Sequence, residues 1–381
     1  MRSPRVIVIG AGPAGSTAAR RLAEEGVRVT LLEARRLPRD KTCAGGVTPK
    51  ARQWVPEGVL EDAGFSVHKY EFRGGRLPPF RLDEPDAEIS MVLRASFDYA
   101  LAEAAASAGC DVLDGEPAEH IVEQEHRVEV RTRRSALVAD YVVGADGYPS
   151  RVAHELGLGQ ALSRRSLAIS GHVPLSPALP ADRAVISFSV ARGYAWYFPK
   201  GDHASVGIGA HLGTDATRES VDVLRNSLES FAANAGFGLD HVRLTGHWVP
   251  HGIRRAPIVS RRGLLVGDAA GMTDPLLGEG IAYAIGSGRL AAEALLDVVA
   301  GRTTDLTPYE RRLRSTYGRA MRRLGFAARV VEHSPTIALA AARFSPWIRA
   351  YGVNVVSGLR APFTFDQSES AQPASSLKTI T

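Results

Sequence analysis

The chain has 381 residues, of which 45% are hydrophobic and 23% charged, and its formal net charge is +5. This length suffices for two domains around a large core, and no apolar run reaches the roughly 18 residues that a membrane-spanning helix needs. The only cysteines, Cys43 and Cys110, lie far apart without a CxxC motif, which argues against a disulfide framework or a structural zinc site and favours a cytoplasmic protein.

The first elements form the pattern of a dinucleotide-binding βαβ unit. A β-branched run predicts a buried strand at 5–10, so close to the start that we expect no signal peptide. Residues 13–26 predict a helix whose first N–H groups face an anion, and 27–33 predict a second strand. The G-x-G-x-x-G spacing between them permits a tight turn, lets a pyrophosphate approach the backbone closely and lets the helix pack on the strand. A carboxylate at the end of the second strand can accept hydrogen bonds from the ribose hydroxyls. The predicted contacts are Gly10, Gly12, Pro13, Ala14, Gly15, Glu33 and Ala34.

The next elements continue this first domain. Residues 35–49 contain Pro, Gly and Thr without periodicity and predict a loop. Residues 94–109 predict a helix, and 138–146 predict a third core strand.

A second pattern then interrupts the first. Residues 167–249 alternate as strands, with one helix near 215–235, which predicts an inserted domain. A buried strand at 263–268 and a long helix at 279–299 return to the first domain, and the chain is helical again from 308.

The segment GLLVGDAAGMTDPLLGEG favours a flavin over a nicotinamide dinucleotide. An extended flavin needs a second contact region for its ribityl chain and ring, whereas NAD(P) needs one Rossmann half and a substrate domain. Gly267 and Asp268 end a predicted buried strand, where the carboxylate suits a ribityl hydroxyl or caps a helix. Gly278 and Gly280 open the following helix, whose N–H groups can face the pyrimidine edge of the ring.

Three segments together resemble the flavoprotein group that includes the aromatic hydroxylases and the geranylgeranyl reductases. They are the N-terminal glycine motif, GADGYPSRVA at 144–153, and the segment around Gly267 and Asp268. The resemblance implies noncovalently bound FAD, with Arg94 near the pyrophosphate or, alternatively, as a surface arginine. It adds to the expected cofactor contacts Asp146, Gly147, Pro275 and Ile281.

Two further segments resemble the reductases of that group. PRDKTCAGGVTPK at 38–50 is similar to their flavin-side loop, although Ala44 interrupts the expected run of glycines after the cysteine. From it we expect cofactor contacts at Cys43, Ala44, Gly45 and Gly46, with Cys43 either a catalytic proton donor or a small loop residue. GYAWYFPKGDHASVGIG at 193–209 is similar to their aromatic signature. Alternate residues of a strand share a face, so we expect a wall for an apolar polyene formed by Tyr194, Trp196, Phe198 and Pro199.

The expected fold class is α/β: a Rossmann-like FAD-binding domain, an inserted mixed α+β substrate domain with an antiparallel sheet, and a helical C-terminal region. The expected divisions are 1–165 with 250–305 for the FAD domain, 166–249 for the substrate domain with small segments near 67–93, 306–365 for the helical region and 366–381 for a flexible tail.

The function that we expect is saturation of carbon–carbon double bonds in an isoprenoid chain, such as geranylgeranyl diphosphate, a prenylated lipid or the menaquinone side chain. The alternative is an FAD-dependent monooxygenase acting on an aromatic compound or polyketide, and a third hypothesis is a non-enzymatic isoprenoid carrier. No second nucleotide fingerprint is present, so NADPH or a protein electron donor would visit only transiently.

Two features leave alternatives open. Six arginines lie close together in one segment: Arg311, Arg312, Arg314, Arg319, Arg322 and Arg323. They form either a solvated helix face or a surface that attracts anionic lipid or a diphosphate. The apolar segment from 336 to 363 could close a substrate tunnel, lie at the inner face of the membrane or form packed helices. We expect no nucleic-acid partner and no metal, because HWVPHG carries His247 and His251 beside a Pro and a Gly that disfavour a helix, and oligomeric state is not indicated.

Overall fold

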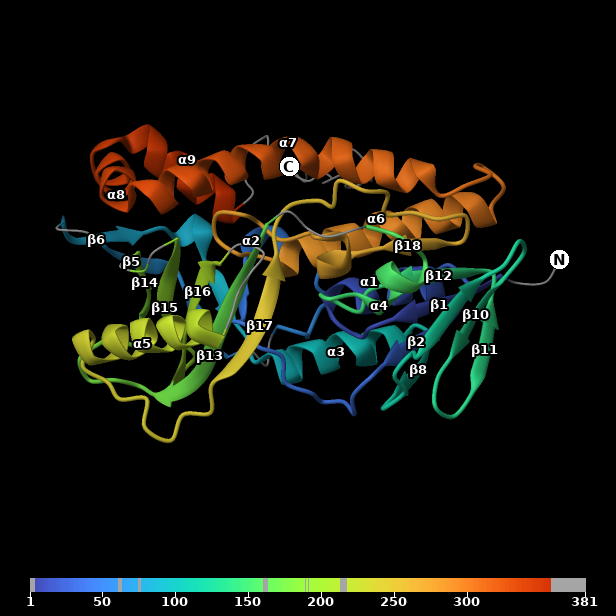
Figure 1. The fold of residues 1–381 in the computed structure, drawn as a ribbon, viewed down its shortest axis with the longest axis horizontal. Coiled ribbons are helices and arrows are strands. Elements are labelled where there is room, and N and C mark those ends of the chain that lie inside the picture. The colour runs from blue at the N-terminus through green and yellow to red at the C-terminus, as the bar shows by residue number, and fades with distance from the viewer. Residues whose placement is uncertain are drawn as a thin grey trace, which may run out of the picture.

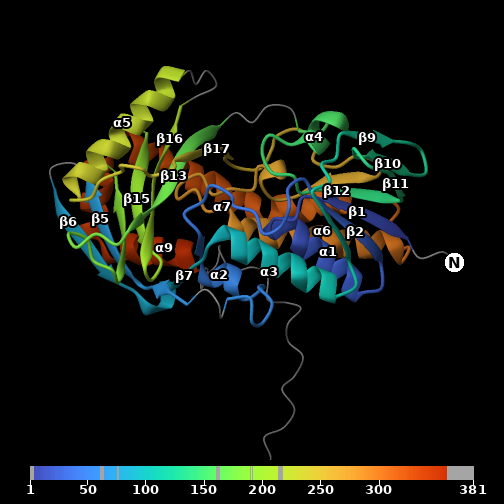
Figure 2. The same cartoon turned by 90° about the horizontal axis from the view of Figure 1, so that it is seen from below.

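The computed structural model describes residues 4–60, 64–74, 77–159, 164–188, 190, 192–212 and 218–357. The predicted tail at 366–381 lies outside the described residues. Two β-sheet regions stand side by side (Figures 1 and 2), and the C-terminal helices lie along the top of both in Figure 1.

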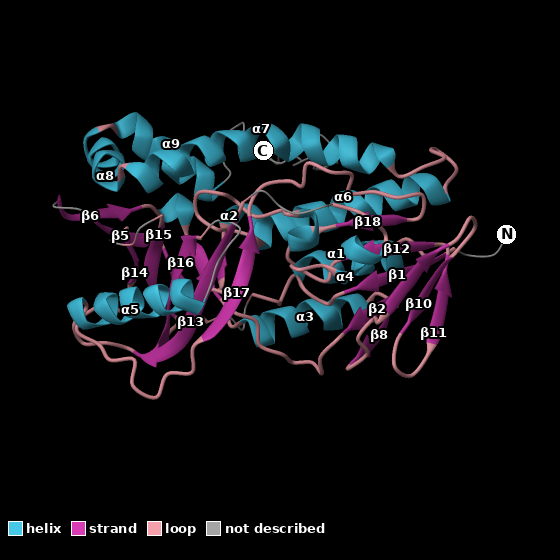
Figure 3. Cartoon of the chain, viewed as in Figure 1, coloured by secondary structure: helices cyan, strands magenta, loops and turns pink. Residues whose placement is uncertain are grey.

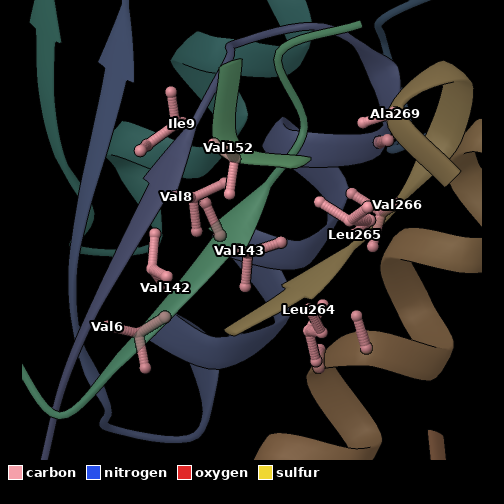
Figure 4. Close-up of a cluster of buried hydrophobic side chains, with 14 of the residues drawn as sticks. Val6, Val8, Ile9, Val142, Val143, Val152, Leu264, Leu265, Val266 and Ala269 are labelled. Atoms are coloured by element: carbon pink, nitrogen blue, oxygen red, sulfur yellow. The ribbon is translucent and has the colours of Figure 1, made fainter. Parts of the chain in front are cut away.

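The dinucleotide half is built on a parallel sheet of five strands in the order β18-β12-β1-β2-β8. Their bounds are β1 Arg5–Ile9, β2 Arg28–Glu33, β8 Asp111–Asp114, β12 Tyr141–Gly144 and β18 Gly263–Leu265. Burial on both faces requires continuous apolar runs, and Val6, Val8 and Val143 pack with β18 in the core (Figure 4). Helix α1 packs against α3 and α6, and these helices span Pro13–Glu24, Arg94–Ser107 and Ile281–Val299.

Two predicted strands have different boundaries in the structure. The single strand expected at 138–146 is two strands, because the chain turns at Asp140, whose carboxylate accepts a hydrogen bond from the Arg5 N–H at 2.7 Å. The first, β11 Ala136–Ala139, joins β10 Val128–Arg131 and β9 His120–Glu123 in a small antiparallel sheet. The strand expected at 263–268 ends at Leu265, because Gly267 adopts a φ of 56° and begins the 3-10 helix Gly267–Ala270.

The second half is a sheet of seven strands in the order β17-β13-β16-β15-β14-β5-β6. All neighbours are antiparallel except β14 and β5. The bounds are β5 Lys69–Gly74, β6 Leu77–Asp83, β13 Arg165–Pro174, β14 Arg183–Ser187, β15 Gly193–Pro199, β16 His203–His211 and β17 Thr245–Pro250. Helix α5, Arg218–Asn234, covers one face through Leu224 and Leu228, and the pair α8 and α9 lies on the opposite side (Figure 1).

The chain from 307 is helical, as predicted. Helix α7 spans Thr307–His333, α8 spans Pro335–Phe344 and α9 spans Pro346–Ser357. Figure 3 shows α7 running lengthwise beside α6 toward α8 and α9. Pro308 fits the first turn of α7, and Leu313, Tyr317 and Leu324 recur on its buried face. None of the helices in the described part of the chain is long and apolar enough to cross a bilayer.

Short elements join the two halves. A three-stranded sheet places β3 Gly46–Val47 and β4 Ser66–Val67 on either side of β7 Ile89–Met91. Helix α2, Pro49–Arg52, follows β3 directly, so the loop that was expected at 35–49 ends in a strand. The expected fold class is confirmed: a parallel Rossmann-like core, additional sheets and C-terminal helices.

Candidate active site

One cavity of about 1630 Å³ runs between the two halves, from the glycine-rich turn to the C-terminal helices. Nearly all the predicted site residues line it: Gly10, Gly12, Pro13, Ala14, Glu33, Ala34, Cys43, Ala44, Gly45, Gly46, Arg94, Asp146, Gly147, Gly267, Asp268, Pro275, Gly278, Gly280, Ile281, Tyr194, Trp196 and Phe198. Gly15 and Pro199 are not among the lining residues. The cavity therefore brings together predicted site residues from Gly10 to Ile281, which are far apart in the chain.

In the glycine-rich turn, Gly15 is needed for packing, whereas Gly12 leaves open space. A Cβ added at Gly15 would lie 1.9 Å from the Gly10 carbonyl oxygen, so helix α1 could not approach strand β1. A Cβ at Gly12 would meet only the Arg39 guanidinium, at 3.9 Å. Gly12 therefore faces free volume at the positive end of α1, which fits a pyrophosphate.

Four buried charged side chains pair with one another in the cavity wall beside this turn. The Glu33 carboxylate accepts from the Ala11 N–H at 3.1 Å and pairs with Arg39 Nε at 3.0 Å. Arg39 also reaches Asp98 at 2.7 Å, and Arg94 binds both oxygens of Asp98 at 2.8 Å. Burial alone would raise the pKa of Asp98, but the Arg94 and Arg39 guanidiniums outweigh it and lower that pKa.

Arg94 is thus a buried residue on the cavity wall rather than a surface arginine. Arg39 and Asp98 were missed by the sequence analysis, because pairing across 59 positions leaves no local pattern. The only signal was the position of Arg39 inside the loop at 38–50.

The second group of predicted cofactor contacts centres on Asp268. Its carboxylate accepts hydrogen bonds from Lys41 Nζ at 3.1 Å and from the Thr273 hydroxyl at 3.1 Å. Burial would raise its pKa, but Lys41 lowers it, so the group is anionic. Gly280 precedes α6 directly, and a Cβ there would lie 3.5 Å from the Asp268 carboxylate. Lys41 is a third residue that the sequence analysis did not single out.

Asp146 has a local structural role in addition to lining the cavity. Its carboxylate accepts from the Ser150 hydroxyl at 2.6 Å and from the Arg151 and Val152 N–H groups at 2.6 and 3.1 Å. It thereby fixes the start of helix α4, Arg151–Glu155. Burial raises the pKa of Asp146 despite these hydrogen bonds.

The cysteine loop is held against the start of α3. Gly45 has a φ of 74°, and a Cβ there would lie 2.2 Å from the Val92 carbonyl oxygen, so only glycine fits. The Gly45 N–H donates to Cys43 Sγ at 3.3 Å, and Lys200 Nζ donates to the Val92 carbonyl at 2.8 Å. Burial lowers the pKa of Lys200 to about 8. The loop thus places a half-buried thiol on the cavity wall near two cationic side chains, Arg94 and Lys200.

Most of the remaining cavity wall is aromatic and aliphatic, although Glu84, Arg192 and Arg349 also line it. Strand β15 presents Tyr194, Trp196 and Phe198 on the cavity face, as the alternation predicted, while Tyr197 packs toward α5. Ring centroids of Tyr194 and Trp196 lie 6.0 Å apart. Strands β5 and β6, β14 and the C-terminal helices extend this wall with Tyr70, Phe72, Phe80, Leu82, Ile186, Phe188, Val331, Leu339 and Val353.

A buried ion pair borders the cavity where these two walls meet. Glu279 contacts both the Thr48 hydroxyl and Lys50 Nζ, and Lys50 also donates to the Val355 carbonyl at 2.8 Å. Nearby Asp274 is fully buried, and burial raises its pKa to about 6. These residues connect the start of α6 to α2 and α9. Their only signal in the sequence was the Gly278-Glu279-Gly280 segment at the start of the predicted helix.

The two histidines lie on or beside strand β17, not on a helix. Burial lowers the pKa of each to about 4, so both are neutral near pH 7. His251 bonds the Ser166 hydroxyl at 2.7 Å and the Asp274 carbonyl at 3.2 Å, whereas His247 lines the cavity. No group of three or more His, Cys, Asp or Glu side chains that could hold a metal occurs among the residues with described positions.

Comparison with known proteins identifies a family. The family described as FAD binding domain matches residues 4–323. A digeranylgeranylglycerophospholipid reductase of Methanothrix thermoacetophila is 32% identical over 341 residues, covering 84% of this chain and 85% of the relative. A chloroplastic geranylgeranyl diphosphate reductase of Arabidopsis thaliana is 28% identical, covering 78% of this chain and 66% of the relative.

Solved structures agree with these relatives. A geranylgeranyl bacteriochlorophyll reductase-like protein from Thermoplasma acidophilum matches with a TM-score of 0.71 at 25% identity, covering 91% of this chain and 98% of that chain. The flavin-dependent brominase Bmp2 matches with a TM-score of 0.74 at 19% identity, covering 93% and 94%, and shows likeness of fold alone. The matches define an FAD-dependent oxidoreductase. Within that class, the chain belongs to the geranylgeranyl reductase family, which confirms the resemblance found in the sequence.

Proposed function

We propose that this protein saturates carbon–carbon double bonds in an isoprenoid chain. The observation that carries the proposal is the predominantly apolar wall between the cysteine loop, Tyr194 and Trp196, and the C-terminal helices. Such a wall suits a long hydrocarbon, because the substrate offers no polar group along its length for the protein to bind. The relatives named as reductases of geranylgeranyl compounds support the same substrate class.

The residues at the opposite end fit FAD. The open space at Gly12 and the start of α1 would take the pyrophosphate, Glu33 the adenosine ribose, and Asp268 the ribityl chain. Bound and reduced, FAD would supply hydride to one carbon of the alkene. Arg39, Asp98 and Lys41 would hold these contacts in place, since each forms an ion pair with another member of the site.

The second carbon of the alkene needs a proton, because an isolated alkene accepts hydride poorly without one. Cys43 is our candidate donor, and a water on the flavin side is the alternative. The loop geometry favours the thiol, because Gly45 holds it on the cavity wall. If Cys43 donates, Cys43→Ala should slow alkene reduction by about 100-fold or more while leaving flavin reduction by dithionite unchanged.

The proposal is tested by incubating the dithionite-reduced holoenzyme with geranylgeranyl diphosphate, a geranylgeranylated glycerophospholipid or menaquinone. Mass spectrometry should show a gain of two hydrogens per bond for at least one of them. No gain with any polyprenyl compound would contradict the proposal. An oxygenated product formed with a phenol in air, together with rapid NADPH oxidation, would instead support a monooxygenase.

The physiological reductant is open between NADPH and a protein donor. No second glycine fingerprint occurs in the sequence, and Gly207 and Gly209 of the VGIGAHLG segment lie within strand β16. Both donors can be compared directly by following bleaching of the flavin absorbance under anaerobic conditions. The faster donor at equal concentration identifies the reductant class.

A further inference from the structure

The four most exposed large apolar side chains in the described part of the chain lie on the three C-terminal helices. Phe326 of α7 is 67% exposed, Ile337 and Phe344 of α8 are 67% and 76% exposed, and Trp347 of α9 is 75% exposed. Exposed apolar residues are normal when scattered, but a concentration of the largest ones on adjoining helices marks an interaction surface. We refer to these four residues as the apolar rim.

Two residues of the apolar rim lie where the cavity reaches the surface. Phe326 and Trp347 line the cavity and are also exposed, as is Val330 one turn beyond Phe326. Leu339 of α8, which is buried, lines the same end of the cavity. Helices α7, α8 and α9 therefore border this end of the cavity, and the aromatic side chains of β15 line the same cavity.

The outer face of α7 beside this opening is basic. Arg319, Arg322, Arg323 and Arg329 are exposed and recur at helical spacing with Phe326. Among the described residues, no carboxylate lies within salt-bridge distance of these four arginines. The two acidic residues of α7 are engaged elsewhere: Glu310 pairs with Arg314, and Glu332 pairs with Arg164.

We propose that the apolar rim and the arginine face of α7 dock on an anionic lipid bilayer, so that an isoprenoid chain passes from the bilayer into the cavity between α7 and α9. Aromatic side chains beside unpaired arginines form the usual surface of a helix that lies in a membrane interface. Charge complementarity selects an anionic membrane over a neutral one. The entry route rests on the proposed function, whereas docking itself does not.

Docking is tested with the full-length holoenzyme and vesicles of phosphatidylcholine alone or mixed with phosphatidylglycerol. The wild type should float with the mixed vesicles and bind neutral ones much more weakly. The double variant Ile337→Ser, Phe344→Ser should lower binding by at least about tenfold, because it removes two inserted apolar side chains that do not line the cavity. Arg322→Gln with Arg323→Gln should remove most of the preference for phosphatidylglycerol.

Val223→Ser is the matched control, because Val223 is 57% exposed on α5, which covers the other face of the large sheet. It should bind as the wild type does. Absence of wild-type binding to mixed vesicles would overturn the proposal. So would a concentration-dependent dimer that the Ile337→Ser, Phe344→Ser variant abolishes, if vesicle binding stays unchanged. Because flotation needs no substrate, failure of docking is distinguishable from failure of the reductase assay.

Discussion

The two ends of the cavity are built in opposite ways. At the nucleotide end, Glu33, Arg39, Asp98 and Arg94 form a buried chain of ion pairs on the Rossmann-like core. At the far end, the wall consists mainly of aromatic and aliphatic side chains from the large sheet and from helices whose outer faces expose Phe344 and other large apolar residues.

This contrast follows from what each end is proposed to bind. A dinucleotide carries charges and hydroxyls at fixed positions, so its site needs polar groups held in one geometry by neighbours. A polyprenyl chain has neither, so its site needs volume and an apolar lining, and small changes of shape matter more than single hydrogen bonds. Substitutions at the two ends of the cavity should therefore impair stability or binding for different physical reasons.

The largest effect is expected at the charged end. Asp98→Ala should lower the free energy of unfolding by about 3–5 kcal/mol, because it leaves the buried guanidiniums of Arg39 and Arg94 without their shared carboxylate. The control is Glu24→Ala, whose exposed ion pairs with Arg20 and Arg21 should contribute less than about 1 kcal/mol. Urea unfolding of both variants measures the difference, and equal midpoints would show that the buried pairs are not needed.

The apolar end should respond to shape. A Cβ at Gly207 would lie 2.3 Å from the Trp196 ring, whereas one at Gly209 on the same strand would be 3.8 Å from its nearest neighbour. Gly207→Ala should cost about 1–3 kcal/mol and displace Trp196 from the cavity wall, while Gly209→Ala should be nearly neutral. Thermal unfolding and tryptophan fluorescence test this, and a pair of indistinguishable variants would contradict the packing described for β15.

The same end shows what a sequence can and cannot predict. The two-residue spacing of Tyr194, Trp196 and Phe198 was enough to predict a shared face, because strand alternation is a local property. The ion pairs could not be predicted in this way, since Lys50 and Glu279 are brought together only by the packing of α2 on α6.

The residues at which strands end could not be predicted from the sequence either. The strand expected to reach Asp268 stops three residues earlier, because Gly267 takes a left-handed conformation that apolar periodicity does not reveal. The domain divisions and the individual roles of the site residues stay predictions.

Gly12→Ala separates cofactor binding from folding. Its Cβ has room in the protein, so the free energy of unfolding of the apoprotein should change by less than about 0.5 kcal/mol. If the pyrophosphate fills that space, FAD affinity should fall at least about tenfold, or 1.4 kcal/mol. Flavin fluorescence titration measures the affinity. Unchanged affinity would mean that the pyrophosphate does not lie against Gly12. The comparison variant Gly15→Ala should prevent folding, because its Cβ would lie 1.9 Å from a backbone oxygen.

The last effect depends on pH and involves His251, which bonds the Ser166 hydroxyl and the Asp274 carbonyl. An unfolded histidine takes up its proton near pH 6.5, whereas burial lowers the pKa of His251 to about 4 in the folded protein. The unfolded state therefore binds more protons between these values, so stability is present above pH 6.5 and is lost as the pH falls toward 4.

His251→Asn keeps an N–H for the Asp274 carbonyl but does not titrate, so it should reduce the loss of stability between pH 6.5 and 4 by about 3 kcal/mol. The exposed His126 provides the control, because His126→Asn should leave the pH profile unchanged. Urea midpoints at pH 7, 6, 5 and 4 measure both. A profile that stays as steep in His251→Asn would assign the acid sensitivity to other groups, with His247 first among them, because its pKa is also lowered to about 4 by burial.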